Sequence, residues 1–393
     1  MKSRHLGFWA AAISVTANLV HPSLARADRD VLVRSARYSR RAAATPTPAT
    51  PMPVAAPVPQ AAPVPQAALG LLPSPAYGGQ NARGSFGHLE RMDARFDALI
   101  APGTEMELLA NGFQWSEGPT WVWREKAVIF SDVPQNTAYK WSAKGGIQVF
   151  LKPSGYTGTY FNFPEGGSNG LTVGPDGSLV LCQHGDRRIS RLTSQGFESL
   201  VKYYEYRKFN SPNDLVFDRL GNLYFTDPPY GLEGGNASPL KELPWNGVYL
   251  LRPSGEVELL TKSMTFPNGI ALSPDQKTLY VSQSDENNPV ILAFPIKADR
   301  TLGDGRVFYD AAPQREGRPG VPDGLKVDRL GNVFATGPAG VHVLTPEGRL
   351  LGIINTGGPT GNCCWGDDGS TLYITADKSL VRIRTLTKGA GFR

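Results

Sequence analysis

Acidic and amide side chains recur at one position of a repeated pattern. They stand near the start of an apolar run at Glu117, Asn169, Asn213, Asn268 and Asp323, with Gly361-Asn362 in a sixth copy. Oxygen ligands without His or Cys suit Ca²⁺, or Mg²⁺ if water completes its shell. Asn and Asp also cap turns, but no turn requires Glu117. Because two carboxylates buried together are costly without a cation, the set predicts one divalent metal.

Short β-strands must bring these residues together. From residue 105 onward, apolar runs alternate with Gly, Asp, Asn and Pro, as in chains of many strands joined by tight turns. Six segments share a polar loop, a strand, a turn and a second strand, and later apolar runs bring each unit to about four strands. The segments begin 52, 44, 55, 55 and 38 residues apart, at Ser116, Ser168, Pro212, Pro267, Pro322 and Thr360.

This repeat predicts an all-β fold, a six-bladed β-propeller with four-stranded antiparallel blades around a central channel. The innermost strand of each blade lines the axis, so equivalent polar positions converge and make the channel metal-binding. Chance recurrence of Gly-Asp turns does not explain six copies with the polar residue at the same offset. A β-sandwich does not use about 290 residues as one unit.

These segments resemble the SMP-30/gluconolactonase/luciferin-regenerating-enzyme family of calcium-dependent propellers. The resemblance covers roughly residues 105–385 and rests on SEGP at 116–119, SPND at 211–214, FPNG at 266–269, PDG at 322–324 and NCCWGDDGSTLYIT at 362–375. The stretch CQHGDRRISRL at 182–192 is similar to bacterial gluconolactonases. The Pro-rich segment before the repeats is not part of the family pattern.

The resemblance implies a metal held by Glu117, Asn213, Asn268 and Asp323, with positions open for water and substrate. Ca²⁺ is the expected ion, with Mg²⁺, Mn²⁺ and Zn²⁺ as alternatives. Asn169 matches a position that only some members fill with Asn, so we place it nearer the substrate than the metal. The implied reaction is hydrolysis of a sugar lactone, such as D-glucono-1,5-lactone to gluconate, in carbohydrate metabolism.

Two aspartates are candidates for activating the attacking water. The metal would polarise the lactone carbonyl, and Asp323, beside both metal and substrate, is the expected general base. Direct attack by Asp323 is the alternative. Asp214, next to Asn213, is expected on the substrate side, where it either acts as the base or orders the ligand shell.

The motif QHGDRR contains a further candidate, His184. Its ring is expected either to hydrogen-bond a sugar hydroxyl or to be a structural histidine. Arg187 and Arg188 are expected at a solvated strand end, with contact to a carboxylate product as the alternative.

Fold and metal centre do not name a substrate. The same site suits a metal-dependent esterase or phosphotriesterase acting on fluorophosphates or aromatic lactones. A non-catalytic extracellular interaction propeller would need no metal, and a synthase on a related fold should lack the full acidic and amide ring.

The N-terminal region is expected to direct export. Lys2 and Arg4, an uncharged stretch at 6–20 and Ala25-Arg26-Ala27 predict a signal peptide over residues 1–27 and a periplasmic or secreted protein. Residues 28–80 form a basic and then Pro/Ala-rich leader that is expected to be disordered. A connecting segment at 81–104 then leads to the propeller at 105–393.

Charge and cysteine content exclude several other classes of protein. The net charge of +5 is concentrated near the N-terminus, and the body from residue 48 holds 32 basic and 33 acidic residues. This balance predicts no nucleic-acid partner, and the apolar stretch at 6–20 is too short to span a membrane. Cys182, Cys363 and Cys364 are expected to be small buried side chains rather than a redox or zinc site.

Overall fold

The computed structural model describes residues 86–159 and 163–392. The predicted signal peptide and leader lie outside these residues, as do residues 81–85 of the connecting segment. The chain divides into Met1–Leu69 and Gly70–Arg393, and the fold reported below belongs to the second unit alone. No helix among the described residues is long and apolar enough to cross a membrane.

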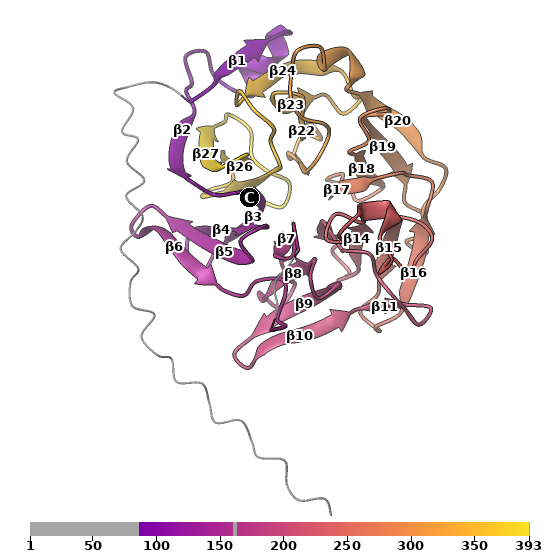
Figure 1. Ribbon diagram of the computed structural model, residues 1–393. Coiled ribbons are helices and arrows are strands. Elements are labelled where there is room, and N and C mark those ends of the chain that lie inside the picture. Colours follow the sequence, from indigo (N-terminus) through magenta and orange to yellow (C-terminus); the bar gives the residue numbers. More distant parts are fainter. Residues whose placement is uncertain (1–85, 160–162, 393) are drawn as a thin grey trace, which may run out of the picture. The chain divides into compact units, whose positions relative to one another are not determined.

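Six antiparallel sheets surround a central axis (Figure 1), so the predicted six-bladed propeller is confirmed. The first blade contains β3 (Ser116–Val122), β4 (Ala127–Asp132), β5 (Thr137–Ser142) and β6 (Gly146–Leu151). The second contains β7 (Ser168–Val173), β8 (Leu179–Gln183), β9 (Arg188–Thr193) and β10 (Gly196–Val201). The third contains β13 (Leu215–Phe217), β14 (Leu223–Asp227), β15 (Gly247–Leu251) and β16 (Val257–Thr261).

The remaining blades continue the same order from the axis outward. The fourth contains β17 (Pro267–Leu272), β18 (Thr278–Gln283), β19 (Val290–Pro295) and β20 (Arg306–Asp310). The fifth contains β21 (Leu325–Val327), β22 (Val333–Gly337), β23 (Gly340–Leu344) and β24 (Leu350–Asn355). The sixth contains β25 (Asn362–Gly366), β26 (Thr371–Ala376), β27 (Ser379–Arg384) and, as its outer strand, β2 (Glu107–Asn111).

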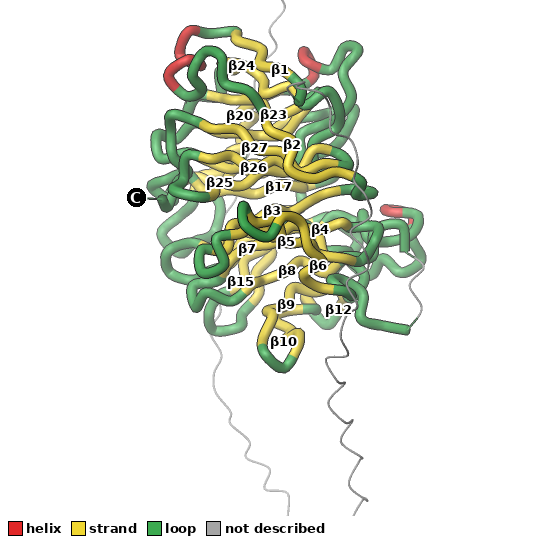
Figure 2. The backbone as a smooth tube through the Cα atoms, turned by 90° about the vertical axis from the view of Figure 1, so that its left-hand side faces the viewer, coloured by secondary structure: helices red, strands yellow, loops and turns green. Residues whose placement is uncertain are grey.

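Strands from the N-terminal side complete the last two blades. Pairing of β2 with β27 joins the two ends of the propeller and closes the ring. Strand β1 (His88–Arg91) pairs with β24 as a fifth strand of the fifth blade, and Figure 2 also shows the two strands together. The 3₁₀ helix η1 (Ala94–Ala98) follows, and its Phe96 is buried in the core between blades five and six. The described part of the connecting segment therefore packs against the propeller.

The core consists of apolar contacts between neighbouring blades. Six hydrophobic clusters occur among the described residues, one at each blade interface. The neighbouring blades cover both faces of a central strand. The strands β4 and β22 are therefore buried along their whole length, and their sequences do not alternate between apolar and polar residues. Cys182, Cys363 and Cys364 are free and buried in these clusters, as predicted.

Shorter elements lie in the loops between strands. They are the hairpin of β11 (Tyr203–Tyr204) and β12 (Arg207–Lys208), and the 3₁₀ helices η2 (Gly235–Ala237) and η3 (Ala312–Gln314). The hairpin belongs to the connection between the second and third blades, ahead of Asn213.

Candidate active site

The predicted polar positions lie at the start of the innermost strands. Glu117, Asn169 and Asn268 are the second residues of β3, β7 and β17, and not loop residues as the sequence pattern predicted. Each of these strands changes register at this point: the shift begins after Glu117 in β3, and it includes Asn169 in β7 and Asn268 in β17. Such bulges re-aim a side chain at a sheet rim. Asn213 and Asp323 lie two residues before β13 and β21.

A glycine after most of these residues lets the innermost strands approach closely. A β-carbon on Gly118, Gly170 or Gly269 would collide with the backbone of the equivalent polar residue in the next blade. The Gly170 N–H instead donates to the carbonyl oxygen of Asn213 at 2.7 Å. Equivalent residues of successive blades are therefore neighbours around the channel.

Four side-chain oxygens of this ring have no hydrogen-bond partner among the described residues. They are buried Oδ1 atoms from the second to fifth blades, of Asn169, Asn213, Asn268 and Asp323. Buried acceptors are nearly always paired in folded proteins. Four unpaired acceptors in adjacent blades indicate a site for an electropositive ligand.

The two ring carboxylates repel each other. Burial, followed by the charges of Asp323 and Asp214, raises the pKa of Glu117 well above its usual range. Burial, followed by the charges of Asp214 and Glu165, does the same to the pKa of Asp323. No group of three or more His, Cys, Asp or Glu among the described residues is arranged to hold a metal. A metal here would therefore depend on the amide oxygens.

The hydrogen bonds of Asn268 orient its amide group. Ser284 donates its hydroxyl proton to the carbonyl oxygen of Pro322 at 2.6 Å and therefore accepts from Asn268 Nδ2 at 2.8 Å. Because Nδ2 donates to Ser284, Oδ1 is the amide atom of Asn268 that is left without a partner among the described residues. It also connects Asn268 to the segment that carries Asp323.

Asp214 lies in a polar network in the same channel. Its carboxylate accepts the backbone N–H of Leu215 at 2.9 Å and that of Ile270 at 3.3 Å. Lys326 Nζ is 3.9 Å from Asp214 Oδ2 and donates to Asn362 Oδ1 at 3.1 Å. Burial is the largest influence on the pKa of Lys326 and lowers it, but the charges of Asp214, Cys363, Cys364 and Glu117 together make the net shift upward. The sixth-blade amide, Asn362, is thus occupied by an internal ammonium group.

His184 is fully buried and neutral. Burial lowers its pKa to about 4, although the carbonyl of Glu165 acts in the opposite direction. Its Nδ1 lies 3.2 Å from that carbonyl oxygen, which fixes Nδ1 as the donor and Nε2 as an acceptor. The Nε2 atom is buried and has no partner among the described residues. It remains available to a ligand hydroxyl.

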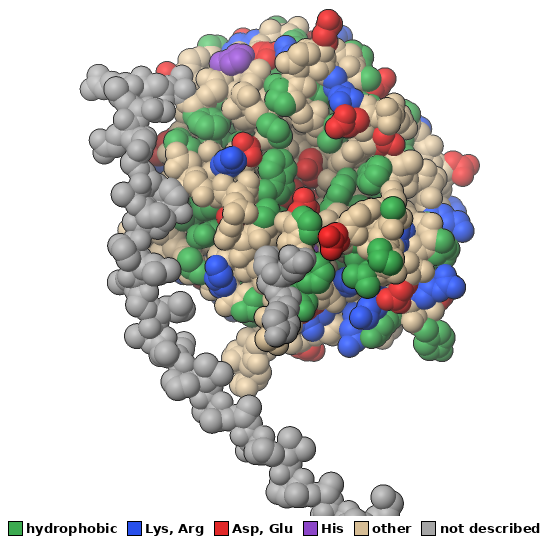
Figure 3. All heavy atoms as spheres, viewed as in Figure 1, with side chains coloured by type: hydrophobic (Ala, Val, Ile, Leu, Met, Phe, Trp, Pro, Cys, Tyr) green, Lys and Arg blue, Asp and Glu red, His purple; other side chains and the backbone are tan. Residues whose placement is uncertain are grey.

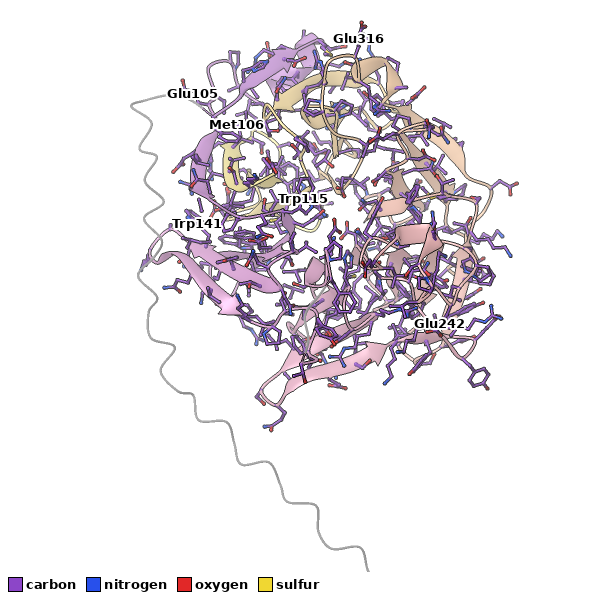
Figure 4. The ribbon with its side chains drawn as sticks, in the orientation of Figure 1. Glu105, Met106, Trp115, Trp141, Glu242 and Glu316 are labelled. Atoms are coloured by element: carbon purple, nitrogen blue, oxygen red, sulfur yellow. The ribbon has the colours of Figure 1, made fainter. Side chains whose placement is uncertain are left out.

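The expectation for Arg187 is wrong. Only 9% of this residue is exposed, and its Nε donates to the carbonyl oxygen of Phe209 at 2.7 Å. Its ion-pair partner Glu242, 3.4 Å away, lies far from the ring centre in Figure 4. Arg187, in the turn just before β9, therefore connects this turn to the loop before the third blade. Arg188 pairs with Asp186 at 2.9 Å.

Three residues near the ring were missed from the sequence. Lys326 appears there as an ordinary alternating residue of a strand, and Glu165 and Tyr230 lie in connecting loops. The hydroxyl of Tyr230 is buried without a partner that meets hydrogen-bond geometry, and burial raises its pKa. Its ring stacks on Phe266 with centroids 6.0 Å apart. The sequence feature that could have pointed to Tyr230 is the PPYG stretch at 228–231, which follows the second strand of the third repeat.

The mouth of the channel combines acidic and apolar surface. Figure 3 shows acidic side chains at the centre of this face, with hydrophobic side chains around them. Trp115, just before β3, lies beside the ring centre in Figure 4, and its backbone N–H donates to Asp132 at 3.2 Å. Polar groups in an apolar rim are typical of a small-molecule site.

Comparisons with known proteins agree with this geometry. The family described as SMP-30/Gluconolactonase/LRE-like region matches residues 115–378. A gluconolactonase from Zymomonas mobilis is 41% identical over 323 residues, covering 79% of this chain and 89% of that protein. The solved gluconolactonase from Xanthomonas campestris is 31% identical with a TM-score of 0.67, covering 77% of this chain and 97% of the other. This chain belongs to the SMP-30/gluconolactonase/LRE-like family.

Proposed function

We propose that the protein is a metal-dependent lactonase, a carboxylic ester hydrolase that opens a sugar lactone such as D-glucono-1,5-lactone. The observation that carries the proposal is the set of four unpaired, buried oxygens beside Glu117. Leaving a buried acceptor unpaired costs about 1–3 kcal/mol, so such a set is retained for a ligand. The family and the two gluconolactonases described above support the substrate class.

Glu117, Asn213, Asn268 and Asp323 would hold the metal, and their oxygens fit a hard divalent cation. Ca²⁺ suits them best, with Mg²⁺, Mn²⁺ and Zn²⁺ as alternatives. The bound ion would polarise the lactone carbonyl as a Lewis acid. Asn169, whose oxygen is also free, remains on the substrate side of the ring.

The protein's own side chains would divide the remaining work. Asp323 is partly exposed as a residue, and its carboxylate would take the proton of the attacking water. His184 Nε2 would accept a hydrogen bond from a hydroxyl of the sugar. Both carboxylate oxygens of Asp214 already accept backbone N–H groups. That arrangement favours an ordering role for Asp214 over general-base catalysis.

A substrate panel tests this function against its rivals. Acid release at constant pH should be fastest with aldonolactones, slower with an aryl ester and undetectable with an aryl phosphotriester. Preference for the phosphotriester would favour the esterase or phosphotriesterase alternative. Absence of turnover with every compound in calcium-loaded protein would favour a non-catalytic interaction propeller.

We also propose that the chain is exported to a periplasm or beyond, on the basis of the signal-peptide pattern over residues 1–27. Expression in a bacterial host with a periplasm should yield a soluble periplasmic protein that begins at Asp28. The intact mass of the purified protein measures this directly. Recovery of uncleaved protein from the cytosol alone would contradict export.

A further inference from the structure

Near the ring, one carboxylate has no structural partner in the part of the chain that the structure describes. The segment between β6 and β7 carries Glu165, whose side chain is 37% exposed. No described residue donates a hydrogen bond to its carboxylate, and the ionisable atom within 4 Å is Nδ1 of the neutral His184, at 3.9 Å. A carboxylate that holds nothing in place is free to act on a ligand.

The backbone around Glu165 is nevertheless fixed. The Gly167 N–H donates to the carbonyl oxygen of Val133 at 2.9 Å, and the His184 N–H donates to that of Gly167 at 3.1 Å. The Gly185 N–H donates to the carbonyl oxygen of Gly166 at 3.2 Å. These bonds join the segment to the loop after β8. The backbone therefore holds Glu165 in a defined position, with part of its side chain accessible to solvent.

Electrostatic interactions link Glu165 to the proposed reaction centre. Its charge contributes to the raised pKa of Asp323 and to that of Tyr230. Among the described titratable groups, His184 lies within 4 Å of this carboxylate, and Asp323 and Tyr230 are near enough to respond to its charge. The carboxyl group of Glu165 and the candidate general base are thus close enough to interact electrostatically.

We propose that Glu165 is the general acid of the reaction and protonates the ring oxygen that leaves when the lactone opens. This inference rests on the proposed lactone hydrolysis. The oxygen of water forms the new bond to the carbonyl carbon, and its proton passes to Asp323. The bond from that carbon to the ring oxygen breaks, its electron pair stays on the oxygen, and the proton of Glu165 completes the new hydroxyl. Exchange with solvent then restores both carboxyl groups.

Among the groups at this site, Glu165 is best matched to that task. Although 37% of its side chain is exposed, the protein atoms around the carboxyl group raise its pKa to about 7, so a substantial fraction of these carboxyl groups is protonated at neutral pH. His184, with its pKa lowered to about 4, carries none. Tyr230 keeps its proton too tightly, because burial raises its pKa.

Glu165→Gln tests the assignment, with Glu233→Gln as the matched surface control on the loop after Tyr230. Glu165→Gln should lower kcat for glucono-1,5-lactone at least about 100-fold, with KM changed less than about threefold. The control should keep wild-type values. An acid must be protonated to act, so wild-type kcat should fall as the pH rises through about 7. That alkaline limb should be absent in Glu165→Gln and present in Glu165→Asp.

A leaving group that needs no proton provides a second readout. With dihydrocoumarin, whose ring opens to a phenolate, Glu165→Gln should lose less than about tenfold. Wild-type turnover of the aldonolactone by Glu165→Gln, or an alkaline limb retained in that variant, would overturn the assignment. Wild-type protein without lactonase activity would instead refute the proposed function. Melting curves of the variants identify any that fail to fold.

Discussion

Metal-stripped protein is expected to lose all measurable lactone hydrolysis and to melt at a lower temperature. Without a cation, the charges of Glu117 and Asp323 oppose each other, and four oxygens of the ring stay unpaired. A ligand that binds only the folded state, at 100 times its Kd, stabilises it by about 2.7 kcal/mol. For a domain of this size we expect a melting temperature roughly 5 °C lower after chelation.

The assay adds metals back one at a time to dialysed protein. Ca²⁺, Mg²⁺, Mn²⁺ and Zn²⁺ should restore activity to different extents, because an oxygen ring accepts several hard cations. Melting curves under the same conditions separate binding from turnover. Full activity and an unchanged melting curve in excess chelator would contradict a metal site.

The same carboxylates give the metal effect a pH dependence. In metal-free protein the pKa values of Glu117 and Asp323 are raised above those of an unfolded chain. Such groups add stability below the ordinary carboxyl pKa of about 4, and the contribution is lost as the pH rises through the raised values. Metal-free protein should therefore lose stability toward higher pH. The stabilisation by metal should grow in the same direction.

The blades and the ring could be predicted because both depend on local, repeated signals. Turn residues mark every unit, and the polar residue is the second residue of each of the first five units, from Glu117 to Asp323. Once such units surround an axis, equivalent positions must meet. The bulges at Glu117, Asn169 and Asn268 were not predictable, since they arise from pairing with the second strand of each blade.

Other parts of the site depend on contacts that no local pattern reveals. Gly361 fills the ring position of the sixth blade, and Asn362 lies one residue further on, where the Lys326 ammonium group donates to its amide oxygen. Glu165 comes close to His184 only in the folded chain, where the segment before β7 lies against the loop after β8. Ring closure pairs β2 with a strand near the other end of the chain. These contacts could not be predicted from the sequence, because the residues involved are far apart along the chain and become neighbours only after the blades assemble.

Exchanging charge without changing shape isolates the role of Asp323. Asp323→Asn keeps an oxygen at nearly the same place but removes a charge and the ability to take a proton from water. Because general-base catalysis contributes about 10²- to 10⁴-fold, we expect kcat to fall at least about 100-fold at saturating metal. Turnover is measured beside metal affinity by calorimetry, so a weakened site is not mistaken for lost catalysis.

Asn268→Asp is the matched control. The new carboxylate adds charge and can still bond Ser284 if that hydroxyl turns from Pro322, so metal should bind at least as tightly. Its activity should fall mainly through a weaker Lewis acid. A base acts when deprotonated, so the acid limb of the wild-type pH profile should disappear in Asp323→Asn, whereas the alkaline limb should disappear in Glu165→Gln. Near-wild-type turnover of Asp323→Asn at saturating metal would leave Asp323 as a ligand and nothing more.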